Sequence, residues 1–170
     1  MNKQELREKI IAKRKTINTE EISGQIVENI RRLAAYKTAQ NVMLFYPMKY
    51  EINLLNLLND KKNFFLPKID GDNLLICPFS QTNKLEISDF NTKEPQTTPA
   101  EPDDIDLIFV PALCVDLDNN RLGYGKGYFD RLLKDFNGIS IVPISEQFVF
   151  DTIPTEDFDV PVDIVITENY

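Results

Sequence analysis

The chain has 170 residues, 42% of them hydrophobic and 27% charged, and this size and composition predict one globular domain spanning residues 1–170. The net charge of −8 argues against general binding of nucleic acid or anionic membranes, and the lack of histidine excludes Ser-His-Asp catalysis, Cys-His catalysis and His-based zinc sites. Cys77 and Cys114 lie in apolar runs, as free thiols do in a reducing compartment. Because the N-terminus is charged and no apolar run has membrane-spanning length, we expect a cytoplasmic protein.

Helical and extended patterns alternate along the first half of the chain. In chain order, we expect a basic amphipathic helix over 3–17, a helix from its N-cap Thr19 to about Tyr36, a strand over 41–46, a helix over 51–58, a strand over 64–66 that Pro67 stops, and a strand over 74–77.

The second half begins with a polar segment, residues 91–104, whose three prolines predict an ordered loop or lid. The elements expected after it are apolar strands over 106–110 and 112–115, a glycine-rich loop, a helix over 128–135 ended by Gly138, and strands over 139–144 and 163–167. Helices that alternate with apolar strands predict an α/β fold with a largely parallel sheet covered on both faces.

The glycine-rich loop carries the strongest functional signal. Residues Arg121–Arg131, R-L-G-Y-G-K-G-Y-F-D-R, hold three of the six glycines. Glycines at this density allow positive φ and close approach to a ligand, and exposed N–H groups before a helix attract phosphate. The spacing matches neither a Walker A loop nor the Rossmann fingerprint. The loop therefore predicts a nucleotide or phosphorylated ligand, and the alternative is a tight turn that uses glycine for geometry alone.

Other charged residues allow two interpretations each. Asp130 either complements the dipole of the following helix or helps to hold Mg²⁺ beside phosphates. Lys3 and Arg7 lie one helical turn apart, either on a solvated face or closing over a triphosphate. Glu51 is a helix-terminal charge or reads a ligand at a strand end. The aspartates near the C-terminus form turns or approach a metal: Asp157, Asp159 and Asp163.

Two runs together resemble a known family. The segment D-L-I-F-V-P-A at 106–112, followed by Arg121–Arg131, is similar to the signature of the 5-formyltetrahydrofolate cyclo-ligases. The segments 3–7, 46–51 and 153–167 resemble other parts of that family in the same order. Phe158 is a departure, since the family often has histidine there, and Phe129 and Asn119-Asn120 also differ from its pattern.

The resemblance implies a three-layer α/β sandwich with a largely parallel central sheet flanked by helices. It also implies an enzyme that uses ATP and Mg²⁺ to convert 5-formyltetrahydrofolate into 5,10-methenyltetrahydrofolate, with release of ADP and phosphate. The expected route is phosphoryl transfer to the formyl oxygen, followed by attack of the second folate nitrogen. The alternatives are a nucleotide- or folate-binding regulatory module without turnover, and a different small-molecule kinase or sugar-phosphate enzyme. We expect a monomer without nucleic-acid or membrane partners.

The resemblance also implies roles for individual residues. Lys126 and Arg121 are expected to be catalytic, with Lys126 nearest the transferred phosphoryl group, and Asp130 and Asp159 are expected to hold Mg²⁺. The residues expected to bind ATP are Lys3, Arg7, Arg121, Gly123, Tyr124, Gly125, Lys126, Gly127, Tyr128, Asp130 and Arg131. Those expected to bind the folate are Tyr46, Glu51, Tyr124, Gly125, Lys126, Gly127 and Tyr128.

Overall fold

The computed structural model describes residues 1–88 and 92–170. Its helices are α1 (Lys3–Arg14), α2 (Thr19–Arg32), α3 (Ala34–Thr38) and α4 (Tyr128–Lys134), and its 3₁₀ turns are η1 (Leu55–Asn59), η2 (Pro102–Asp104) and η3 (Glu146–Phe148). Its strands are β1 (Asn41–Met43), β2 (Asn63–Asp70), β3 (Asn73–Phe79), β4 (Leu85–Ile87), β5 (Lys93–Pro95), β6 (Leu107–Phe109), β7 (Cys114–Asp116), β8 (Arg121–Leu122), β9 (Ile139–Pro143), β10 (Val149–Phe150) and β11 (Ile164–Ile166).

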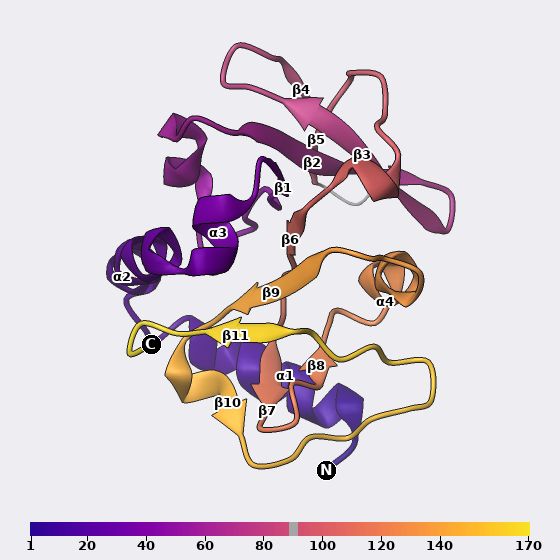
Figure 1. Cartoon of the computed structure of the whole chain (residues 1–170). Helices are drawn as coiled ribbons and strands as arrows, with labels where there is room; N and C mark the ends of the chain where they lie inside the picture. The colour runs from indigo at the N-terminus through magenta and orange to yellow at the C-terminus, as the bar shows by residue number, and fades with distance from the viewer. Residues whose placement is uncertain (89–91) are drawn as a thin grey trace.

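A six-stranded sheet in the order β11-β9-β6-β1-β2-β3 forms the centre of the molecule (Figure 1). All neighbouring strands in it are parallel except β2 and β3, which form an antiparallel hairpin. β1 and β6 are adjacent, with Val42 opposite Leu107. Because both strands run the same way, the segments that follow them emerge at the same edge of the sheet.

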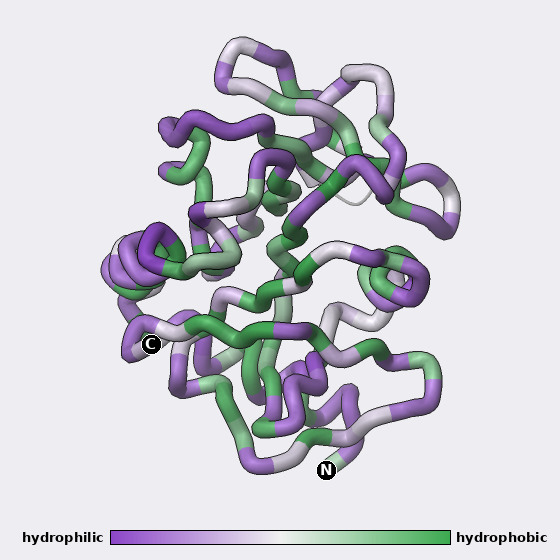
Figure 2. Tube along the Cα trace, in the orientation of Figure 1, coloured by the Kyte–Doolittle hydropathy of each residue, from purple (hydrophilic) through white to green (hydrophobic). Residues whose placement is uncertain are grey.

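Successive side chains of each central strand enter two different cores, one on each face of the sheet. Val42 and Phe64 pack with α2, α3 and η1, whereas Met43 and Phe65 pack with α1, α4 and the segment 110–115. The strands are hydrophobic along their length as a consequence, which Figure 2 shows as green on β9 and β11. The predicted three-layer α/β sandwich with a largely parallel central sheet flanked by helices is thereby confirmed.

Pro67 does not stop the strand over 64–66, so that prediction is wrong: β2 continues to Asp70. β1 pairs with β2 only as far as Phe65, and Pro67 lies opposite Ile76 on the other side. The Ile76 carbonyl accepts from Ala100 N at 2.8 Å and so points away from β2. Pro67 therefore occupies a position where a missing N–H removes no bond of the ladder.

The helix predicted over 51–58 is absent, and only the 3₁₀ turn η1 forms there. The Asn53 side chain accepts from Leu55 N at 2.9 Å, a local bond that competes with helix formation. The second predicted helix is interrupted, since α2 ends at Arg32 and extended backbone at Leu33 precedes α3. Its N-cap is Asn18 and not Thr19, and α1 ends at Arg14.

Two further predictions in the second half are corrected. Of the segment 91–104, residue 91 lies outside the described residues, but 93–95 form strand β5, with Glu94 and Pro95 buried. Gly138 does not end α4, whose C-cap is Asp135. A Cβ atom on Gly138 would lie 2.7 Å from the Asp106 carbonyl oxygen, so glycine is needed for the close approach of β9 to β6.

A small three-stranded sheet in the order β10-β7-β8 carries the glycine-rich loop. The buried carboxylate of Asp116 organises it. Oδ1 accepts from the backbone N–H groups of Asp118 and Asn120, each at 3.0 Å, and Oδ2 accepts from Asn120 Nδ2 and from Ile153 N. One carboxylate therefore joins the turn before the glycine-rich loop to the start of the C-terminal segment.

None of the helices in the described part of the chain is long and apolar enough to span a membrane.

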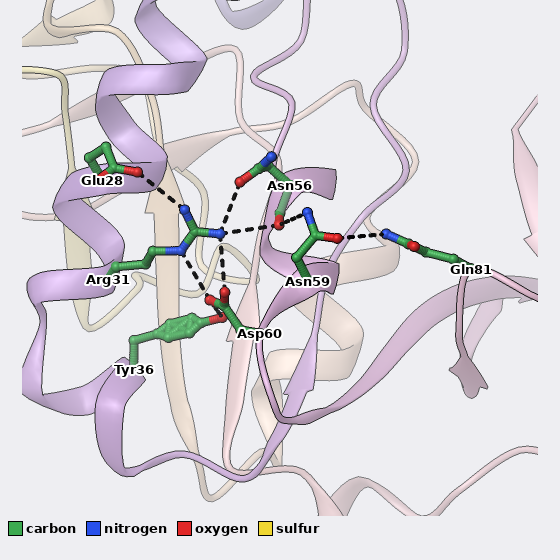
Figure 3. A network of polar contacts seen from close by, with 7 residues as sticks. All are labelled: Glu28, Arg31, Tyr36, Asn56, Asn59, Asp60 and Gln81. Atoms are coloured by element: carbon green, nitrogen blue, oxygen red, sulfur yellow. Dashed lines mark hydrogen bonds and ion pairs between the residues drawn. The ribbon is translucent and has the colours of Figure 1, made fainter.

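On the face of the central sheet that α2 and α3 cover, a polar network joins these two helices to η1 (Figure 3). Arg31 donates two hydrogen bonds of 3.1 Å to the Asp60 carboxylate, and the Tyr36 hydroxyl donates to Asp60 at 2.7 Å. Arg31 also contacts Glu28 and Asn56. Burial raises the pKa of Asp60, but the hydrogen bonds from Arg31 and Tyr36 outweigh it, so its net pKa is lowered.

We expect Asp60→Asn to lower the free energy of unfolding by about 2 kcal/mol at pH 7, the scale of hydrogen bonds to a charged group. Because folding lowers the pKa of Asp60, this stabilisation is complete above the pKa of the unfolded carboxylate. It is lost as the pH falls through the lower folded value. Urea denaturation of both proteins, with the exposed Asp151→Asn as a control, should show a difference that narrows below about pH 4. Equal stability at pH 7 would contradict the assignment.

Candidate functional site

A cleft of about 1400 Å³ opens where the chain leaves β1 and β6. Its walls are formed by α1, the segment 45–51, the β2–β3 hairpin, residues 92–94, the glycine-rich loop and residues 154–160. All fourteen residues predicted to bind or act line this single cleft: Lys3, Arg7, Tyr46, Glu51, Arg121, Gly123, Tyr124, Gly125, Lys126, Gly127, Tyr128, Asp130, Arg131 and Asp159.

Two arginines hold the backbone of the glycine-rich loop. Arg7 Nε donates to the Gly123 carbonyl at 2.9 Å. Arg131 donates to the Lys126 carbonyl at 3.0 Å and to the Asp72 carbonyl at 2.7 Å, which ties the loop to the β2–β3 turn. Gly125 has φ +103, and Gly127 has φ +70 at the N-cap of α4. Both φ values favour glycine strongly, so these glycines are required by geometry as well as by access to a ligand.

Arg121 and Asp130 form a buried pair at the base of the cleft. Arg121 Nη2 lies 3.4 Å from Asp130 Oδ1, and Nη1 donates to the Pro111 carbonyl at 3.0 Å. Burial lowers the pKa of Arg121, and the Asp130 charge opposes that shift. Arg121 Nε is buried without a hydrogen-bond partner among the residues the structure describes. An unsatisfied buried donor of a cation is costly, so the position of Arg121 carries a free-energy cost that its bonds to Asp130 and Pro111 offset only in part.

Lys3, at the start of α1, is held by acidic groups of the C-terminal segment. Its Nζ lies 2.7 Å from Asp159 Oδ2 and 3.1 Å from Glu156 Oε1. Asp159 Oδ2 also accepts from Glu156 N at 2.9 Å. Phe158, 62% exposed, presents its ring 5.2 Å from Lys3 Nζ. The N-terminal helix is thus fastened across the cleft to the segment that carries Asp159.

Glu51 is buried in the wall of the cleft, with both carboxylate oxygens engaged. Oε1 accepts from Met48 N at 2.7 Å, and Oε2 accepts from the Tyr124 hydroxyl at 3.2 Å. Burial raises the pKa of Glu51, while the Met48 N–H, Arg14 and Tyr124 favour the charged form. The left-handed backbone of Tyr50, with φ +69, turns the chain so that the carboxylate folds back on Met48. Glu51 is therefore presented by a strained turn and not by a helix.

Two polar side chains of this region were not predicted to have a role. Glu94 is buried in the cleft wall and accepts from Ile69 N at 2.7 Å, which completes the edge of β2 beyond the end of β1. Arg14 is buried under the glycine-rich loop. The signal for Arg14 was its spacing of seven residues from Arg7 on the apolar face of the first helix. Asp163, in contrast, lies outside the cleft and accepts from the backbone N–H of Ser140 at 2.9 Å.

The acidic residues of the cleft offer few ligands for a metal. No group of three or more His, Cys, Asp or Glu side chains that could hold a metal ion occurs in residues 1–88 and 92–170. Asp130 Oδ1 accepts from Val160 N and pairs with Arg121, and Asp159 Oδ2 pairs with Lys3, so each carboxylate uses one oxygen in these contacts. Mg²⁺ commonly binds through one or two carboxylates together with phosphate oxygens. The pair Asp130 and Asp159 fits that arrangement and does not fit an all-protein cage.

The structure is that of a three-layer α/β domain whose glycine-rich loop and charged side chains line one cleft, an arrangement typical of proteins that bind small phosphorylated ligands. Within that class, the chain belongs to the 5-formyltetrahydrofolate cyclo-ligase family, whose model matches residues 1–168. This membership confirms the resemblance seen in the sequence, and with it the expectation of an enzyme.

Relatives named 5-formyltetrahydrofolate cyclo-ligase cover nearly the whole chain. The Haemophilus influenzae protein is 24% identical over 93% of this chain and 92% of its own, and the Mycoplasma pneumoniae protein is 26% identical over 99% of each. The NMR structure of the Aquifex aeolicus 5,10-methenyltetrahydrofolate synthetase has a TM-score of 0.88 and 34% identity, covering 100% of this chain and 91% of that one. The fold described above is thus similar to that of a solved 5,10-methenyltetrahydrofolate synthetase.

We expect Gly125→Ala to destabilise the protein by about 1–3 kcal/mol, because its φ of +103 is strained for any residue with a side chain. A Cβ atom there would lie 3.5 Å from Arg7 Cζ, an ordinary van der Waals contact, so the cost comes from the backbone and not from a clash. Gly24→Ala is the matched control, since Gly24 lies within α2 with no atom within 4 Å of its Cβ position. Urea denaturation should show that Gly24→Ala has a free energy of unfolding up to about 1 kcal/mol above that of the unmodified protein. Equal effects at the two sites would contradict the assigned backbone role of Gly125.

Proposed function

We propose that this protein catalyses the ATP-dependent conversion of 5-formyltetrahydrofolate into 5,10-methenyltetrahydrofolate, with release of ADP and phosphate. Membership of the cyclo-ligase family supports the folate conversion. The observation that carries the ATP dependence is the meeting, in one cleft, of a cation-rich glycine loop and the buried carboxylate of Glu51. One end suits a triphosphate and the other suits a heterocycle that donates hydrogen bonds.

The reaction needs an activated oxygen. The formyl oxygen of an amide is a poor leaving group, and transfer of the γ-phosphoryl group of ATP to it turns it into phosphate, which leaves when the second folate nitrogen attacks the carbon. Phosphoryl transfer depends on positioning and on stabilisation of charge, and not on a strong base. Lys126, Arg121 and Arg7 are the cations suited to this task. A chain without histidine is therefore equipped for the chemistry.

The folate end of the cleft is suited to a pterin. Its ring system carries adjacent N–H donors, and a carboxylate accepts from such an edge with two oxygens. Glu51 supplies the carboxylate. The ring of Tyr46 and the 41% exposed ring of Tyr124 offer flat apolar surfaces beside it. We assign Tyr46, Glu51 and the segment Tyr124–Tyr128 to the substrate.

Mg²⁺ would be held by Asp130 and Asp159 together with phosphate oxygens. When bound, the metal neutralises the negative charge of the phosphates. Lys3 and Arg121 pair with these two carboxylates in the structure. Once the carboxylates bind the metal, the two cations would be available to pair with the phosphates. The remaining ATP contacts are assigned to the N–H groups of the glycine-rich loop and to Arg131.

The experiment that tests this proposal follows the absorbance of the methenyl product with purified protein, 5-formyltetrahydrofolate, ATP and Mg²⁺. An increase that requires both ATP and Mg²⁺, with one phosphate released per product, is the expected result. Saturable binding of either substrate without product would instead indicate a binding module without turnover. Product formation without ATP would refute the phosphoryl-transfer route.

We expect Lys126→Ala to lower kcat by about 100- to 1000-fold, the cost of removing one preorganised donor at developing charge. The fold should persist, because Lys126 lies in the loop that lines the cleft and not in either core. Lys37→Ala, an exposed position on α3 at the opposite face, is the matched control and should keep full activity. Near-normal turnover by a folded Lys126→Ala protein would refute its assigned role.

A further inference from the structure

Helix α1 carries three cations on one face, of which Lys3 and Arg7 line the cleft and Arg14 lies buried behind it. Lys3, Arg7 and Arg14 follow one another at spacings of four and seven residues, which lie on one face of a helix. Lys3 contacts Asp159, and Arg7 contacts the glycine-rich loop. Arg14, in the last turn of the helix, has no role in the function proposed above. It is only 7% exposed, so its contacts have to account for a buried charge.

The Arg14 guanidinium is fixed from two directions. Its Nη2 donates to the Ala112 carbonyl, in the segment that leads from β6 to β7. Its Nη1 donates to the Tyr124 hydroxyl at 2.8 Å. The ring of Phe148 lies 6.0 Å from its Cζ. An arginine with only a structural role would be accounted for by contacts with the backbone and with packed side chains. Arg14 in addition donates to Tyr124, a residue that lines the cleft.

The direction of the protons along this chain of contacts follows from the groups involved. An arginine only donates, so the Tyr124 oxygen accepts from Arg14, and its own proton is left for Glu51 Oε2 at 3.2 Å. Met48 N holds the other carboxylate oxygen at 2.7 Å. The carboxylate is thus oriented from both sides, by the backbone of its own turn and by a hydroxyl whose orientation Arg14 determines.

We propose that Arg14 is a positioning residue, which acts through the Tyr124 hydroxyl to orient the Glu51 carboxylate for the donor edge of the pterin. This inference rests on the proposed function, since it assigns Glu51 to the folate. Arg14 does not contact the substrate. Its contribution is to keep one hydroxyl rotamer, and hence one carboxylate orientation, before the substrate enters.

Loss of Arg14 has a predictable effect on pH dependence. Burial raises the pKa of Glu51, and the groups that face it and favour the charged form are the Met48 N–H, Arg14 and Tyr124. Without Arg14 the pKa of Glu51 rises further, so the carboxylate becomes protonated at a higher pH and loses its acceptor capacity. The acid limb of folate binding therefore moves to higher pH.

The test compares Arg14→Met and Arg14→Lys with Lys13→Met, a neighbouring exposed cation on the same helix. We expect Arg14→Met to raise KM and Kd for 5-formyltetrahydrofolate by about tenfold, the scale of one charged hydrogen bond, with KM for ATP changed less than about twofold. Its acid limb should move upward, and Arg14→Lys should restore part of the affinity. Lys13→Met should behave as the unmodified protein.

A second variant keeps the test decisive if Arg14→Met does not fold. Tyr124→Phe removes the hydroxyl that links Arg14 to Glu51 and leaves Arg14 in place. The double variant Tyr124→Phe with Arg14→Lys should raise the Kd for the folate no more than the larger of the two single effects, because both substitutions break the same connection. Additive losses, or equal increases in KM for both substrates, would overturn the inference. If the unmodified protein binds the folate without turnover, the proposed function is refuted but the inference about Arg14 is not. The Kd for the folate in the variants still tests that inference.

Discussion

The pairing of β1 with β6 is the constraint on which the cleft depends. The two strands are adjacent and parallel, so the chain leaves both at one edge of the sheet. The segment after β1 carries Glu51, and the segment after β6 leads through β7 and β8 to Tyr124. Residues 73 positions apart therefore meet in a hydrogen bond. The buried faces of these strands leave no freedom of register, because a shift by one residue would exchange the two cores.

Much of the fold was predictable because it depends on hydrophobic pattern. Strands buried on both faces appear as continuous apolar runs, and such runs marked the positions of β1, β6, β9 and β11. The failures arise where tertiary contacts replace a local rule. Pro67 continues a strand because its ring faces an edge that β1 does not reach, and the Glu94 side chain completes that edge two residues further on. Neither the end of β1 nor the approach of β5 is encoded near Pro67.

The candidate site shows the same division. The glycine-rich loop was recognisable because φ values such as those of Gly125 and Gly127 demand a particular residue type at a particular place. Arg14 was not assigned to the site, because an arginine at the end of a basic helix resembles a solvated charge, and its spacing on the apolar face predicts burial but not a partner. Its partners, Tyr124 and the Ala112 carbonyl, lie about a hundred residues away, and only the folded chain brings them together.

The proposed binding of an anionic ligand has to be reconciled with the acidic composition of the chain. The net charge of −8 repels anions at a distance, but screening limits that repulsion to about 8 Å at physiological ionic strength. Inside the cleft three carboxylates are paired with a cation or linked to one: Lys3 pairs with Asp159, Arg121 with Asp130, and Arg14 reaches Glu51 through Tyr124. These pairings lower the cost of burying the charges, since an unpaired buried ion costs several kcal/mol, roughly. Asp130 and Asp159 are therefore balanced by cations of the protein itself, so an anion that approached Lys3 or Arg121 would have to displace a carboxylate already in place.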